Sequence, residues 1–161
     1  MKYLYLYFLL LIFLVSNDAF SNNVLGDTIR DEITDSVFTW IDSSRDKKLD
    51  LIKRKEYLEK AYINSLDEPN DSLRNVYLTK IAFTYYFKLG DSLMFREVNK
   101  KSIDLSIKIK DSVNLAANYW DLGIFYGDYE LKDSAYFSYY KAQKLYELLK
   151  NNKNSGIMLI N

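Results

Sequence analysis

The sequence contains no histidine and no cysteine, and these two absences exclude several kinds of chemistry. Without an imidazole or a thiol, the chain cannot form a histidine-assisted serine or cysteine triad, a zinc site with such ligands, or a disulfide. With only five glycines, it has no glycine-rich loop that could hold a phosphate. The acidic stretch from Asp67 to Asp71 lacks the central glycine and the terminal glutamate of a calcium-binding loop. We therefore predict a protein that is not an enzyme and that needs no cofactor and no metal.

Neither sign of charge is in excess, because 22 Lys and Arg residues balance 22 Asp and Glu residues. Binding of nucleic acid needs a basic face that neutralises phosphates. The basic residues here are instead interspersed with acidic ones, as in Lys100-Lys101 followed by Asp104. We expect these charges to lie on solvated helix faces, and we predict no nucleic-acid partner.

The amino terminus has the pattern of an export signal. Lys2 precedes an apolar run of 13 residues from Tyr3 to Val15. This length fits the apolar core of a signal peptide, about 7 to 15 residues, and falls short of the roughly 20 residues of a membrane-spanning helix. We predict a signal peptide over residues 1–21, cleaved after Ser21, and an exported, periplasmic protein. Secretion, and a membrane anchor formed by an uncleaved amino terminus, stay open as alternatives.

A single proline and regularly spaced Asp-Ser pairs predict a succession of helices. Asp and Ser are favoured N-caps because their side-chain oxygens accept a hydrogen bond from an unpaired amide of the first turn. Gly90 precedes one pair, where a helix end favours a left-handed residue. The pairs stand 20, 20 and 22 residues apart, at Asp71-Ser72, Asp91-Ser92, Asp111-Ser112 and Asp133-Ser134. Apolar residues between the pairs recur at helical spacing. The predicted helices cover residues 28–42, 46–66, 72–89, 92–109, 112–130 and 134–150.

Consecutive helix pairs resemble one another at a period of about 40 residues. The pairs Lys60-Ala61, Lys101-Ser102 and Lys141-Ala142 stand 41 and 40 residues apart, each on the second helix of a pair. A small side chain at that point lets two helices approach closely. A fixed period of this size is typical of a helical solenoid, with an unrelated antiparallel bundle as the alternative.

Residues 116–149 carry a more specific pattern. Its first helix contains Tyr-x-x-Leu-Gly-x-x-Tyr, and its second contains Ala, an aromatic residue and Ala at fixed spacing. The residues are Tyr119, Leu122, Gly123, Tyr126, Ala135, Tyr139 and Ala142. This segment resembles a tetratricopeptide repeat (TPR), whose helices pack through these positions. The closing proline of that family is absent, with Glu147 in its place.

The TPR resemblance implies an all-α fold, a right-handed α-α superhelix of antiparallel helix pairs that follows the signal peptide. The implied units are 1–21 (signal peptide), 27–66 (degenerate N-terminal helix pair), 71–110 (TPR-like repeat), 112–150 (TPR repeat) and 155–161 (start of a further, cut-off repeat). The last of these is apolar, whereas solenoids normally end in a polar capping helix. We interpret the chain as a fragment of a longer protein, with a minimal cap or a self-associating end as alternatives.

The order of signal peptide and tyrosine-rich repeats is similar to the periplasmic N-terminal sensor region of Bacteroidetes-type TPR signalling proteins. That resemblance implies a later transmembrane helix and a histidine kinase or DNA-binding output domain, which these 161 residues do not contain. Membrane contact would then come only through an uncleaved signal segment or through a missing C-terminal part.

The TPR resemblance also implies a protein or peptide partner, held in a concave groove that the first helices of the repeats line. By analogy, the groove residues are Thr79, Phe83, Tyr86, Trp120, Ile124 and Asp128. Trp120 is the strongest candidate, because Tyr119 already fills the packing position and an exposed tryptophan is typical of a binding surface. We predict a non-catalytic binding module, the ligand- or partner-sensing part of a signalling protein. The alternative is a scaffold that self-associates through exposed repeat ends.

Overall fold

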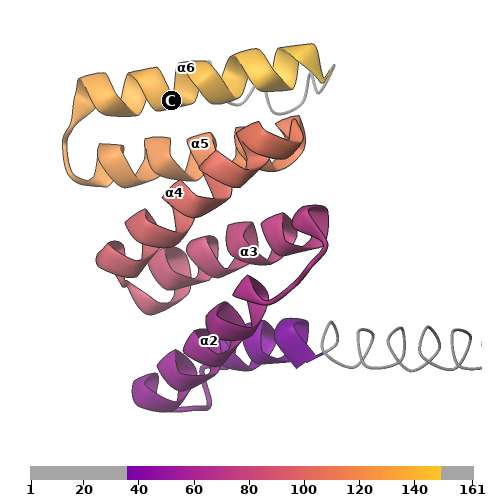
Figure 1. The fold of residues 1–161 in the computed structure, drawn as a ribbon. Coiled ribbons are helices and arrows are strands. Elements are labelled where there is room, and N and C mark those ends of the chain that lie inside the picture. Colours follow the sequence, from indigo (N-terminus) through magenta and orange to yellow (C-terminus); the bar gives the residue numbers. More distant parts are fainter. Residues whose placement is uncertain (1–35, 150–161) are drawn as a thin grey trace, which may run out of the picture. The chain divides into compact units, whose positions relative to one another are not determined.

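The computed structural model describes residues 36–149, and this part of the chain is helical, with no β-strand (Figure 1). A helical stretch over residues 36–45 comes first. The helices that follow are α2 (Leu51–Leu66), α3 (Asp71–Leu89), α4 (Ser92–Ile109), α5 (Ser112–Asp128) and α6 (Lys132–Leu148). The predicted signal peptide over 1–21, its cleavage point and the predicted start of a repeat at 155–161 lie outside the described residues. Within 36–149, no helix is both long and apolar enough to span a membrane.

The all-α class is therefore confirmed, and the helix positions agree closely with the prediction. The helices predicted over 72–89 and 92–109 are α3 and α4, to within one residue at each end. The helix predicted over 46–66 begins later, at Leu51, because Asp50 caps it by accepting a hydrogen bond from the amide three residues ahead at 2.9 Å. The residues just before Asp50 form a turn instead.

Two of the four Asp-Ser pairs cap helices as predicted. Asp91 and Asp111 each accept a hydrogen bond from the amide three residues ahead, at 3.1 and 3.0 Å. The other two pairs begin inside the helix. Asn70 caps α3 in place of Asp71, and α6 has no side-chain cap, with Asp133 in its first turn. An acidic residue in the first turn still suits the positive end of the helix dipole.

The helix ends use left-handed residues to reverse the chain. Gly90 ends α3 with φ +67°, as predicted. Lys110 and Glu130 take the same region after α4 and α5, with φ +59° and +58°. Left-handed backbone costs a residue with a Cβ roughly 1–2 kcal/mol, so the packing of the flanking helices must hold these two turns.

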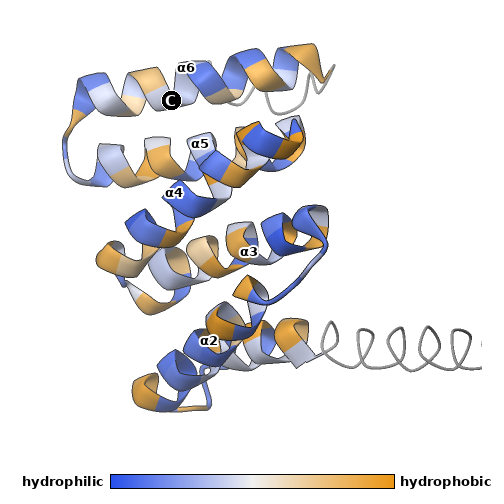
Figure 2. Cartoon of the chain, in the orientation of Figure 1, coloured by the Kyte–Doolittle hydropathy of each residue, from blue (hydrophilic) through white to orange (hydrophobic). Residues whose placement is uncertain are grey.

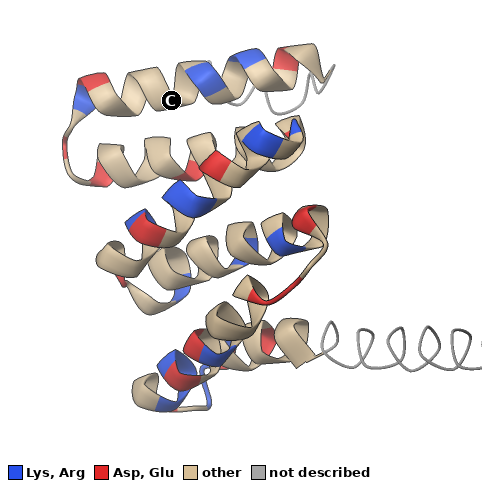
Figure 3. Ribbon diagram, viewed as in Figure 1, with Lys and Arg blue, Asp and Glu red and all other residues tan. Residues whose placement is uncertain are grey.

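Each helix from α2 to α6 packs against the next one, and α3 also contacts α5 (Figure 1). Apolar side chains are buried between these helices while polar ones alternate with them along each helix (Figure 2). The three small residues of the predicted period, Ala61, Ser102 and Ala142, are all 0% exposed, on α2, α4 and α6. Charges of both signs are spread along the helices (Figure 3), as the sequence predicted.

A row of buried polar side chains joins α3, α4 and α5, and we call it the polar ladder. Ser102 donates to the Asn75 side-chain oxygen at 2.9 Å and accepts from the Asn118 amide at 2.8 Å. Asn75 donates in turn to Ser106 and to the carboxylate of Asp111, at 2.8 and 2.9 Å. Buried polar groups cost stability unless they are paired, and these are paired with one another.

Gly123 on α5 lies close against Tyr139 of α6. A Cβ placed on Gly123 would stand 2.6 Å from ring carbons of Tyr139, which real contacts do not allow. Gly127, one turn later on the same helix, has nothing within 4 Å of such a Cβ. The missing side chain at Gly123, the glycine of the predicted packing motif, therefore leaves room for the Tyr139 ring. At Gly127 the space that a Cβ would take is open.

The two glycines predict opposite effects of alanine. We expect Gly123→Ala to lower the free energy of unfolding by about 1–2 kcal/mol, because overpacking strain exceeds the gain in helix propensity. Gly127→Ala should raise it by up to about 1 kcal/mol, since only the propensity gain applies. Urea denaturation followed by circular dichroism measures both changes. Effects of the same sign at the two sites would contradict the close approach of Gly123 to Tyr139.

Candidate functional site

The six predicted groove residues lie on α3 and α5, which are in contact with each other. The hydroxyl of Tyr86 on α3 donates to the carboxylate of Asp128 on α5 at 2.6 Å. Burial, and then the bond to Asp128, raise the pKa of Tyr86 above its ordinary value, so the hydroxyl keeps its proton. This bond joins the ends of the two predicted groove faces.

Phe83 belongs to a continuous aromatic cluster that the sequence prediction contained only in part. Its ring stacks on Phe87 with centroids 4.6 Å apart, and Lys88 lies over it at 5.6 Å. Phe83 and Phe87 are half-buried, so they form one solvent-facing edge of the cluster. Ring contacts of 4.8 to 5.5 Å link the remaining members. The cluster comprises Phe83, Tyr86, Phe87, Phe95, Phe125, Tyr126 and Tyr129.

The side chain of Trp120 is less exposed to solvent than the sequence predicted. It is half-buried, and its ring meets Tyr139 of α6 edge-on with centroids 5.4 Å apart. The same tyrosine ring fills the space beside Gly123. The expectation of an exposed tryptophan is therefore corrected, because α6 comes close enough at Gly123 to cover part of the indole. Ile124, on the following turn, is also half-buried.

Thr79 differs most from its predicted place. Its hydroxyl shares a hydrogen bond with Ser102 at 2.9 Å and lies 3.4 Å from the side-chain amide of Asn118. Thr79 is therefore part of the polar ladder, and its hydroxyl already has partners within the protein. Thr79 is half-buried, so this predicted groove position is only partly open to solvent.

The residues of the predicted packing motif lie on α5 and α6, and two of them, Leu122 and Tyr126, pack against the hydrophobic core. Ala135 and Ala142 are buried on α6. On α5, Phe125, the residue that precedes Tyr126 in the sequence, is also buried. Lys141 lies 4.7 Å above the ring of Tyr119, and its ammonium stands 3.5 Å from the tyrosine hydroxyl. The ring of Tyr119 therefore has a cation against its face. Leu122 packs on the core as a partly buried side chain.

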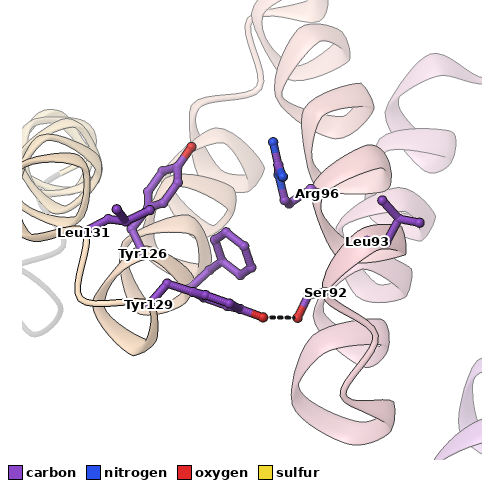
Figure 4. Close-up of a pocket in the computed structure, with 7 residues that line it drawn as sticks. Ser92, Leu93, Arg96, Tyr126, Tyr129 and Leu131 are labelled. Atoms are coloured by element: carbon purple, nitrogen blue, oxygen red, sulfur yellow. Dashed lines mark hydrogen bonds between the residues drawn. The ribbon is translucent and has the colours of Figure 1, made fainter.

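A pocket of about 390 Å³ opens between α4 and the end of α5, where the aromatic cluster reaches the surface. Its lining residues are Ser92, Leu93, Arg96, Phe125, Tyr126, Tyr129 and Leu131 (Figure 4). The hydroxyls of Ser92 and Tyr129 share a hydrogen bond of 2.7 Å that ties the two walls together. None of the lining residues was predicted as a binding residue, and Tyr126 was predicted only as a packing residue.

Arg96 is the one charged side chain among the residues that line this pocket. In Figure 4 it projects from α4 into the space between the two walls, on the side of the Tyr126 hydroxyl. The other described arginines, Arg45, Arg54 and Arg74, each donate hydrogen bonds within the protein. Arg96 makes no hydrogen bond or ion pair with any described residue.

Asp121 is the most deeply buried acid of α5, at 8% exposed. No hydrogen bond or ion pair joins it to another residue of 36–149. Burial alone raises its pKa to about 7, since the charged form loses its hydration without gaining a partner. Asp121 is not among the residues that line the pocket. Within the same range, no group of three or more acidic residues could hold a metal ion.

The outward face of α6 carries exposed aromatic residues. Tyr136 and Phe137 are 72% and 57% exposed, and Tyr136 stacks on Tyr140 with centroids 6.4 Å apart. Lys144 and Lys141 lie over rings of this face, at 5.6 and 4.6 Å. Such a face is more apolar than a helix exposed to water usually is.

No family model matches the chain, and neither a curated protein nor a solved structure matches it. Its function must therefore be inferred from the geometry of 36–149 and from the motifs of the sequence.

Proposed function

We propose that the protein is a non-catalytic binding module of the TPR type, which holds a protein or peptide partner along α3 and α5. The observation that carries this proposal is the half-buried pair Phe83 and Phe87 at the edge of the aromatic cluster. Aromatic side chains that are half-exposed and rigidly supported are the usual anchors of protein interfaces. The cluster beneath them supplies that support.

The proposed TPR-like solenoid is supported by the packing positions. Gly123 admits the ring of Tyr139 between α5 and α6, and small residues are buried at the predicted period of about 40 residues. Each helix contacts its neighbours in sequence, and the first helices of successive pairs, α3 and α5, contact each other. These are the contacts that stacked helix pairs make.

The proposed location and context depend on the sequence alone. The run from Tyr3 to Val15 supports export to the periplasm. The similarity to sensor regions supports a place in a longer signalling protein, where recognition by these repeats would be coupled to an output domain.

A selection of peptides tests the proposed groove. Residues 22–161 would be screened against a phage-displayed library of random twelve-residue peptides, and Kd values of the enriched peptides measured by fluorescence polarisation. We expect Phe83→Ala to weaken these peptides about tenfold, because truncation of an interface anchor costs more than about 1 kcal/mol. Trp120→Phe should weaken them less, because Tyr139 already covers part of the indole.

The matched control is Tyr57→Ala, which removes a half-buried aromatic residue of α2, outside the α3–α5 face. It should leave Kd unchanged. Thermal melting of every variant separates loss of binding from loss of fold. A library that yields no peptide, or peptides that bind the Phe83 variant as well as the wild type, would reject the groove.

A second candidate function is self-association, which the exposed Tyr136, Phe137 and Tyr140 of α6 favour. A second copy that covered this face would remove apolar surface from water. Sedimentation velocity over a hundredfold concentration range should then show dimers that the double variant Tyr136→Ser, Phe137→Ser abolishes. A sedimentation coefficient independent of concentration would reject this candidate.

A further inference from the structure

We propose that the pocket between α4 and α5 binds an acidic side chain of the partner polypeptide, together with an apolar side chain next to it in the partner's sequence. This inference deepens the proposed function, since it presupposes that the protein binds a polypeptide. It assigns a second point of recognition, distinct from the Phe83 edge. The two points lie at opposite ends of the same aromatic cluster.

The charge of the occupant follows from Arg96. Its guanidinium has no acceptor among the described residues, whereas Arg45, Arg54 and Arg74 all have acceptors. A guanidinium presents its donors in a planar fork that matches a carboxylate. A carboxylate that enters this pocket therefore meets an unpaired cation of complementary geometry.

The acidic residues nearest in sequence to the pocket have other contacts or lie outside it. Asp91, before Ser92, accepts from Lys55 at 3.0 Å and caps α4. Burial opposes its ionisation, but those hydrogen bonds outweigh burial and hold the pKa of Asp91 below its usual value. Asp128 accepts from Tyr86. Glu130 forms no ion pair with Arg96.

The apolar side chains that line the pocket indicate that part of its occupant is apolar. Phe125 forms a buried floor, while Tyr129 and Leu131 on the rim are 53% and 50% exposed. An inorganic anion would pair with Arg96 and leave this rim in water. An apolar side chain adjacent to the carboxylate would cover the rim, which favours a polypeptide segment over a free ion.

The rim also defines the size of the occupant. Leu93 is 75% exposed on α4, on the other side of the opening from Leu131. Both leucines line the same pocket of about 390 Å³. A chain that crosses the opening would contact both leucines and place one acidic side chain between them, beside Arg96.

Peptide libraries with a defined terminus test this assignment. The probe is a bead library of random octapeptides that are acetylated and amidated, so that side chains supply every carboxylate. For residues 22–161, we expect enrichment of Glu or Asp beside Leu, Phe, Tyr or Trp. Arg96→Gln should lose the acidic preference and weaken the enriched peptides about tenfold, the usual size of a hydrogen bond to a charged group. Arg96→Glu should instead select Lys or Arg at the same position.

The matched control is Lys100→Gln, which removes an exposed positive charge one turn further along α4. Within 36–149, Lys100 pairs with Asp104 alone. It should keep the acidic preference. Arg96 has no hydrogen bond or ion pair within 36–149, so its variants should melt close to the wild-type temperature.

Several results would overturn the assignment. An unchanged preference in Arg96→Gln, or an equal loss in Lys100→Gln, would do so. Peptides that need Phe83 but not Arg96 would reject the pocket and keep the proposed function. A library that enriches nothing would reject both.

Discussion

Replacing Asn75 with aspartate is expected to lower the free energy of unfolding by about 3–5 kcal/mol at neutral pH, the usual cost of an uncompensated buried charge. Asn75 is fully buried, and its amide nitrogen donates to the carboxylate of Asp111 at 2.9 Å. In Asn75→Asp an oxygen replaces that nitrogen, so two carboxylates face each other without a proton between them. The bond to Ser106 would need a rotated hydroxyl as its donor.

The loss should depend on pH in a defined direction. Burial and the neighbouring charge raise the pKa of the new carboxyl in the folded state above its unfolded value of about 3.9. The penalty is therefore full above the raised pKa and shrinks as the pH falls toward about 4. Urea denaturation of wild type and variant at pH 7.5 and pH 4.5 measures the difference.

The control for this prediction is Asn70→Asp. Asn70 is exposed and caps α3, a place where aspartate caps as well as asparagine does. Its change in stability should stay within about 0.5 kcal/mol, as for ordinary surface substitutions. If both variants lost the same stability, the polar ladder would not be the cause.

Replacing Asp121 with asparagine is expected to have the opposite effect, a gain of about 4 kcal/mol at pH 8. The pKa rises from about 3.9 in the unfolded chain to about 7 in the folded protein, and each unit of pKa shift is worth about 1.4 kcal/mol. Burial raises the pKa of Asp121 to about 7, so the folded protein holds a proton that the unfolded chain has already released. Wild-type stability should therefore fall as the pH rises from about 4 to 7. Asp121→Asn removes the group that ionises.

The stability of the two proteins should accordingly converge below about pH 4, where the carboxyl is protonated in both the folded and the unfolded state. Asp104→Asn is the matched control, because Asp104 is exposed and, among the described residues, pairs with Lys100 alone across one turn of α4. Exposed pairs of this kind contribute little, about 0.3–0.5 kcal/mol. A gain for Asp121→Asn that did not change with pH would show that burial does not perturb this carboxyl.

The helices were predictable because their signals are local. A cap such as Asp111 acts on amides within its own first turn, and Gly90 acts on its own backbone angle. The same locality explains the error at the start of α3. Asn70 and Asp71 are both good caps, and the choice between them depends on the turn before them, where Glu68 accepts from the Asn70 amide at 2.8 Å.

For the candidate site, the sequence could predict which residues share one face of a helix, but not what that face contacts. Spacing placed Phe83 and Tyr86 on one face of α3, and the structure brings Tyr86 to Asp128 of α5. Spacing could not show which neighbour a face meets. Thr79 shares a hydrogen bond with Ser102 of α4, and Arg96 lines a pocket together with residues at the end of α5. These are distances between helices, which depend on every side chain between them.

The polar ladder sets a condition on exchanging repeats between proteins. Helix pairs that meet through apolar side chains can be recombined, because such contacts tolerate many partners. Here α5 meets its predecessor through Asn118, whose amide needs the hydroxyl of Ser102. A chimera that joined α5 and α6 to another repeat would bury an unpaired amide unless the recipient carried the matching serine. The helix pairs of this chain are specific to one another and are not interchangeable parts.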